Sequence, residues 1–229
     1  MRKLFGTDGI RGVAGDPPLD KRTAFAVGVA LAQWSQGHGD EVVIGMDTRE
    51  SGPWIAAHVA GGLESQGVRA RFAGLITTPG LAYIAKTGPF SAGVMISASH
   101  NPFEDNGIKI SDHSGFKLPD EEEARLEGNL FAWLESGASE SDATLREDPS
   151  LDRAYLEHLS STMANGLSGV RMVVDGANGS ASYLGPKLFQ SLGAEVTSIH
   201  CSPDGRNINL NCGSQHLASL REKIGRAHV

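Results

Sequence analysis

Short apolar runs alternate with longer stretches of helical periodicity along the chain as far as residue 134. The apolar runs, which are typical of buried strands, lie at residues 41–46, 68–74 and 93–96. Apolar positions at helical spacing predict helices at residues 19–36, 53–66, 77–86 and 119–134. The connections are too long for hairpins and suit right-handed crossovers between parallel strands. The pattern therefore predicts an α/β fold, with a mixed, mostly parallel sheet sandwiched between helices.

A polar stretch separates this pattern from a second one. Glycine, serine, aspartate and proline are frequent in residues 136–150 and indicate a linker. Beyond it the pattern predicts a helix at 152–163, a strand at 170–174, a helix to residue 192 and a strand at 194–200. Two strands cannot make a stable sheet with both faces covered. We therefore divide the chain into a first domain, residues 1–150, and an incomplete second α/β domain, residues 151–229.

The end of the chain raises a separate question. Residues 224–229, Ile-Gly-Arg-Ala-His-Val, match what one reading frame of a common sequencing adapter encodes. We therefore expect these residues to be foreign to the natural protein, so that the natural sequence breaks off inside the second domain.

The composition is that of an ordinary soluble globular protein, with 40% hydrophobic and 21% charged residues among 229. The net charge of −7 argues against general nucleic-acid binding, which needs a basic face. No apolar run approaches the roughly 18–20 residues of a membrane span, and the first residues contain no apolar signal segment. We interpret the protein as cytoplasmic, with neither a nucleic-acid partner nor a membrane association.

The two cysteines, Cys201 and Cys212, are too few for a disulfide framework. His200 is next to the first, and His216 lies four residues after the second. A zinc site usually has tighter paired ligand spacings than these. Reduced, partly buried thiols are the favoured interpretation, and a metal site is the disfavoured one.

Candidate chemistry gathers in the loop that follows the apolar run at 93–96. Pro102 ends regular pairing in this loop, residues 105–107 are predicted as a turn, and a new strand is expected from residue 108. In open α/β sheets, ligands bind at such strand ends. The polar side chains of the segment that could contact a ligand are Ser99, His100, Asn101 and Lys109.

Two arginines outside this loop could also meet an anion. Arg11 lies in the glycine-rich segment 5–12, which suggests a backbone curved around a ligand; a glycine-rich turn with a solvated arginine is the alternative. Arg49 follows a predicted strand and would share an edge with Ser99 if the strands are parallel. The alternative for Arg49 is a loop salt bridge, either with Asp47 or with Glu50.

Several common catalytic signatures are missing from the sequence. There is no GxxxxGK loop and no GxGxxG, so nucleotide binding lacks its usual signature, and no GxSxG surrounds Ser99. A hydrolytic pair of Ser99 and His100 is disfavoured, because adjacent residues rarely place a hydroxyl on the neighbouring imidazole. Ser99 fits better as the acceptor of a transferred group, and Ser97 is the alternative acceptor.

A phosphoryl group on Ser99 would carry roughly −1.5 to −2 charges. That charge would need cations and amide donors nearby, and Mg²⁺ is the natural counter-ion. The side chains available for this are His100, Asn101, Lys109 and Arg11.

These motifs together resemble a known family. Residues 96–102 and 106–109 are similar to the phosphoserine loop of the α-D-phosphohexomutase superfamily, and residues 5–12 resemble the N-terminal signature of its bacterial phosphoglucosamine mutase branch. The segments 173–179 and 203–209 resemble that family's second domain. The resemblance covers residues 2–223, with the motifs in the family's order.

The resemblance implies interconversion of glucosamine 6-phosphate and glucosamine 1-phosphate, on the route to UDP-N-acetylglucosamine and the cell wall. It implies that Ser99 carries the phosphate, holds Mg²⁺ through it, and exchanges phosphate with the sugar by way of a bisphosphorylated intermediate. Lys109 and Arg11 would stabilise charge or move the proton, and His100 would assist. Thr7, Asn101 and Arg49 are the substrate contacts expected in addition. A homodimer of the complete protein is left open.

The chain also departs from the family pattern. Its four-domain members hold Mg²⁺ with an Asp-Gly-Asp-Gly-Asp-Arg loop, which does not occur here, and their sugar-reading and phosphate-clamping domains are not present. We therefore expect no mutase turnover from the 229 residues alone. Phosphomannomutase or phosphoglucomutase activity, and a non-catalytic sugar-phosphate-binding remnant, are the alternatives.

Overall fold

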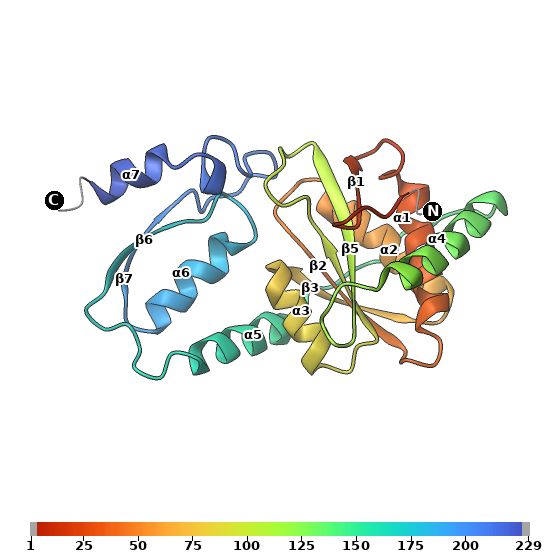
Figure 1. Ribbon diagram of the computed structural model, residues 1–229, viewed down its shortest axis with the longest axis horizontal. Helices are drawn as coiled ribbons and strands as arrows, with labels where there is room; N and C mark the ends of the chain where they lie inside the picture. Colours follow the sequence, from red (N-terminus) through yellow and green to blue (C-terminus); the bar gives the residue numbers. More distant parts are fainter. Residues whose placement is uncertain (1–3, 226–229) are drawn as a thin grey trace.

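The computed structural model describes residues 4–225 and shows two α/β units side by side (Figure 1). The larger unit is built on a five-stranded sheet in the order β1-β5-β4-β2-β3. Its strands are β1 (Ile10–Val13), β2 (Glu41–Met46), β3 (Arg69–Leu75), β4 (Ala92–Ile96) and β5 (Asp105–Asp112). β2 runs parallel to β3 and β4, and β5 runs antiparallel to both β4 and β1. Only β5 therefore opposes the other four strands, which confirms the mixed, mostly parallel sheet.

Helices cover both faces of this sheet (Figure 1). The alternation of side chains along β2 sets the two layers, since Val42 and Ile44 belong to one apolar cluster and Val43 to the other. The first cluster is closed by α1 (Lys21–Ser35), α2 (Gly52–Ser65) and α4 (Asp120–Glu135). The second is closed by α3 (Thr78–Thr87) and α5 (Pro149–Ser161). The predicted sandwich is confirmed.

The predicted linker and connecting helix lie against the first unit rather than free of it. Asp148, in the linker, pairs with the side chain of Arg71 in β3. The backbone N–H of Asp148 donates to the Phe72 carbonyl at 2.8 Å. α5 starts three residues earlier than the pattern predicts, because the Asp148 side chain caps it by accepting from the Ser150 N–H.

The smaller unit has two parallel strands, β6 (Arg171–Asp175) and β7 (Glu195–Ile199), joined through α6 (Ala181–Ser191). This is the predicted second βαβ arrangement. After β7 the chain forms a short 3₁₀ turn, η1 (Gly213–Gln215), and then α7 (Ala218–Ile224). Of the residues expected to be foreign, 226–229 lie outside the described range.

One local prediction is wrong. Residues 105–107 do not form a turn but open β5, where they pair with β1 at Arg11, Gly12 and Val13. The buried Asn106 side chain favours this extended path, because it donates to the Ser51 hydroxyl at 2.8 Å. Part of the glycine-rich N-terminal segment therefore forms a strand, and its few apolar residues did not predict one.

No helix within residues 4–225 has the length and apolar character to span a bilayer.

Candidate functional site

Ser99 lies in the loop that follows β4 and is exposed to solvent. Its backbone is in the left-handed region, with φ of 58°, which is uncommon for a residue other than glycine. Its N–H donates to the hydroxyl of Ser97 at 3.1 Å, and Ser97 itself is buried. Of the two candidate acceptors, Ser99 therefore presents its side chain outward, whereas Ser97 supports the loop from within.

Arg49 fixes the backbone of this loop from below. The side chain is buried, with 1% of the residue exposed, and all three guanidinium nitrogens donate to protein acceptors. Nε pairs with the Asp47 carboxylate at 3.0 Å. The other two nitrogens donate to backbone carbonyls, those of Ser99, Asn101, Pro102 and Asp105.

This geometry bears on the substrate contact predicted for Arg49. A guanidinium whose donors are all used inside the protein has none left for a ligand. The alternative, a loop salt bridge with Asp47, is the arrangement observed. The expectation that Arg49 shares the sheet edge of Ser99 is met, since its Nη2 lies 3.0 Å from the Ser99 carbonyl oxygen.

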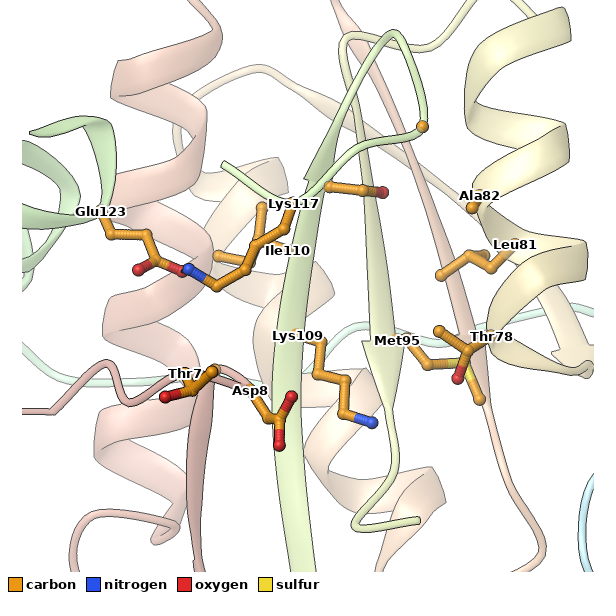
Figure 2. A pocket seen from close by; sticks show the side chains of 13 residues that line it. Thr7, Asp8, Thr78, Leu81, Ala82, Met95, Lys109, Ile110, Lys117 and Glu123 are labelled. Atoms are coloured by element: carbon orange, nitrogen blue, oxygen red, sulfur yellow. The ribbon is translucent and has the colours of Figure 1, made fainter. Parts of the chain in front are cut away.

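Lys109 projects from β5 into a cavity of about 240 Å³ that Thr7 and Asp8 also line (Figure 2). Burial lowers the pKa of the Lys109 ammonium, and the nearby positive charge of Arg11 lowers it further. At the other end of the cavity, the Lys117 ammonium is paired with the Glu123 carboxylate at 2.8 Å. Of the two lysines that line this cavity, Lys117 is thus held in an ion pair, whereas the ammonium of Lys109 is partly desolvated beside Arg11.

Arg11 reaches the same region from β1. Its Nη2 pairs with the Asp8 carboxylate at 3.1 Å, and its Nε is buried without a hydrogen-bond partner among the described residues. Gly9 allows the N-terminal segment to pass close to β5, because a Cβ at this position would lie 2.3 Å from the Ile108 carbonyl oxygen. The structure therefore brings Arg11, Thr7 and Lys109 together.

His100 and Asn101 line a second cavity, between the loop and residues 206–216. The Asn101 amide donates to the Asp105 carboxylate at 2.8 Å, and His100 is exposed. Neither Ser99 nor Arg11 is among the residues that line either cavity. Of the predicted site residues, Thr7 and Lys109 therefore line one cavity and His100 and Asn101 the other, whereas Arg49 lies beneath the loop.

Sequence reasoning missed one residue that touches the Ser99 loop. Asn209, in the second unit, donates from Nδ2 to the carbonyl oxygens of Ser99 and Asn101, at 2.9 and 3.0 Å. Asn209 ends the segment 203–209 that resembles the family's second domain, and asparagines recur at every second position around it, but neither feature predicts a contact with the Ser99 loop.

The described residues do not build a complete Mg²⁺ site at Ser99. Within residues 4–225, histidine, cysteine and carboxylate ligand atoms gather in threes only at Asp175, His200 and Cys212, within 4.8 Å of one another. Asp175 is already engaged there, since it accepts from the N–H groups of Ala177 and Gly213 and meets the His200 ring.

That cluster is accounted for by hydrogen bonding, so we assign it no ion. Both thiols are free, and burial raises the pKa of each. The interpretation of Cys201 and Cys212 as reduced thiols agrees with the structure.

The proximity of Arg11 and Lys109 leads to a testable prediction. Replacing Arg11 by methionine removes one of the two main causes of the low Lys109 pKa and should move that pKa upward, toward the ordinary value for lysine. NMR titration of ¹³Cε-labelled lysine would follow it, with the exposed Lys86, on α3, as the internal reference. An unchanged Lys109 pKa in the Arg11→Met variant would contradict the electrostatic coupling.

Comparison with known proteins agrees with this geometry. Residues 2–136 match the family model described as phosphoglucomutase/phosphomannomutase, alpha/beta/alpha domain I. The chain belongs to this family. It is 54% identical to a phosphoglucosamine mutase of Solibacter usitatus and 43% identical to one of Koribacter versatilis, in each case over 99% of the chain.

These relatives are longer than the chain. It spans about half of their length, 52% of the first and 51% of the second. A solved structure of a phosphoglucomutase/phosphomannomutase family protein from Burkholderia thailandensis covers 96% of the chain, and 49% of that protein is covered in return. With a TM-score of 0.79 and 24% identity, it supports the fold.

Proposed function

We propose that the chain supplies the phosphoserine half of a phosphoglucosamine mutase, which interconverts glucosamine 6-phosphate and glucosamine 1-phosphate. The observation that carries the proposal is the exposed Ser99 side chain on a loop whose backbone is fixed by the buried Arg49. The names of the relatives, at up to 54% identity, favour glucosamine phosphates over the other hexose phosphates of the family.

In the proposed reaction the phosphoryl group moves from Ser99 Oγ to a hydroxyl oxygen of the sugar phosphate. The serine–phosphorus bond breaks, a sugar–phosphorus bond forms, and the hydroxyl proton passes to Lys109 and on to the released serine oxygen. The resulting bisphosphorylated sugar then returns its other phosphate to Ser99. Such a reaction depends mainly on positioning and on charge neutralisation.

The remaining predicted residues have supporting roles in this proposal. Arg11 neutralises charge beside Lys109, and Thr7 contributes a hydroxyl to the same cavity. His100 and Asn101 face the second cavity, where they would contact the sugar phosphate.

A phosphate on Ser99 would supply one ligand to Mg²⁺, whereas no group of three histidine, cysteine or carboxylate side chains within residues 4–225 lies at the loop.

A hybrid protein tests the proposal. Residues 1–223 would be joined to the C-terminal half of the Solibacter usitatus relative, which the chain does not cover. We expect the hybrid to convert glucosamine 6-phosphate, with a phosphorylated Ser99 peptide in its mass spectrum, and the C-terminal half alone to be inactive. A folded hybrid that shows neither turnover nor phosphate on Ser99 would overturn the proposal.

A further inference from the structure

Two donors from different parts of the chain meet the same pair of carbonyl oxygens. Arg49 Nη2 lies 3.0 Å from the carbonyl oxygens of both Ser99 and Asn101. Asn209 Nδ2 lies 2.9 and 3.0 Å from the same two oxygens. The first donor belongs to the five-stranded unit, and the second to the unit that contains β6 and β7.

Asn209 is itself held in place. Its N–H donates to the Ala177 carbonyl at 2.9 Å, and its backbone is left-handed with φ of 60°. Ala177, in the turn after β6, is also left-handed, with φ of 52°. Asparagine tolerates this region better than most residues, so the amide is presented from a fixed backbone.

Two segments of the second unit, the turn after β6 and residues 205–206, also contact the residues on either side of Arg49. The Thr48 hydroxyl donates to the Asn178 carbonyl. The Glu50 N–H donates to the Gly205 carbonyl at 2.9 Å, and the Glu50 carboxylate pairs with Arg206 at 2.6 Å. The second unit therefore holds both the Arg49 segment and the Ser99 loop.

We propose that Asn209 is a positioning residue for Ser99. Its two hydrogen bonds hold the carbonyls of the loop, and with them the left-handed backbone that directs the Ser99 hydroxyl outward. Without that support the serine backbone would relax toward the more favourable right-handed or extended regions. The proposal rests on the proposed function for its catalytic consequence, but the contact itself does not depend on the activity.

Hydrogen exchange on the 229-residue chain tests the contact. Asn209→Ala should make the amides of residues 97–101 and 103–105 exchange about tenfold faster, because two hydrogen bonds to the loop are lost while those from Arg49 to the same carbonyls remain. Asn209→Asp should do the same, because a carboxylate cannot donate to a carbonyl. The control is Asn211→Ala, since Asn211 shares the left-handed backbone, with φ of 53°, but is exposed and makes no bond to the loop among the described residues.

Exchange that stays unchanged in both Asn209 variants, or that rises equally in Asn211→Ala, would overturn the proposal. Faster exchange in Asn209→Ala alone, with Asn209→Asp like the parent, would also overturn it, because packing and not hydrogen-bond donation would then hold the loop.

The hybrid protein tests the catalytic consequence. Asn209→Ala and Asn209→Asp should each lower kcat about tenfold while the KM for glucosamine 6-phosphate and the Tm stay unchanged. An unchanged kcat, or a fall that follows a lowered Tm, would overturn the positioning role. A parent hybrid without any turnover would instead count against the proposed function, and hydrogen exchange would still decide whether Asn209 holds the loop.

Discussion

Replacing Ser99 by alanine should lower the turnover of glucosamine 6-phosphate by the hybrid protein by about 10⁴-fold or more. The alanine variant has no oxygen to accept or donate the phosphoryl group, so both half-reactions stop. Because Ser99 is exposed and its side chain makes no hydrogen bond among the described residues, stability should be unaffected. Steady-state assays and intact-protein mass spectrometry would measure both the lost rate and the lost phosphate.

Ser97→Ala is the matched control, because this second serine is buried two residues earlier and accepts the Ser99 N–H at 3.1 Å. Losing that hydrogen bond should slow turnover only about tenfold and leave phosphate on Ser99. If Ser97→Ala abolished phosphorylation while Ser99→Ala retained it, the acceptor would be Ser97.

Much of the larger unit could be predicted from the sequence, because its strands and helices are long enough for periodicity to be visible. The run Val42-Val43-Ile44 is buried on both faces, which is what a central strand between two helical layers requires. The position of Ser99 at the end of the neighbouring strand then follows from the parallel pairing of β2 with β4.

The errors have a common physical cause: short segments pair with segments that are distant in the sequence. Asp105-Asn106-Gly107 has the composition of a turn, yet these residues form strand because β1 pairs with them and Asn106 bonds to Ser51. Residues 10–13 are too few to show a period, so β1 was not visible either. Short segments take their structure from their partners, which composition does not specify.

The contacts beneath the candidate site could not be predicted from the sequence for a related reason. The sequence places Arg49 next to Asp47, and the ion pair with Asp47 was foreseen as one alternative. The four backbone carbonyls that Arg49 also meets depend on how the Ser99 loop folds back over it. Asn209 lies 110 residues beyond Ser99 and contacts it only through the docking of the second unit.

Replacing Arg49 by methionine should destabilise the chain by about 3–5 kcal/mol, because the change leaves the Asp47 carboxylate buried without its cation. Asp47 is only 3% exposed, and four loop carbonyls would lose a donor at the same time. Urea unfolding of the 229-residue chain, followed by tryptophan fluorescence, would give the change in the free energy of unfolding.

The size of this effect follows from the burial of Arg49 and not from the presence of an ion pair as such. Arg69, the first residue of β3, allows the two contributions to be separated. Arg69 also pairs with carboxylates, those of Asp40 and Glu41, but its side chain is 67% exposed. Arg69→Met should therefore cost only ~0–1 kcal/mol. Arg49→Lys should fall between the two, because lysine keeps the charge beside Asp47 but cannot reproduce the planar fork that reaches the carbonyls of Ser99 and Asn101. Equal losses in Arg49→Met and Arg69→Met would mean that the buried guanidinium does not hold this loop in solution.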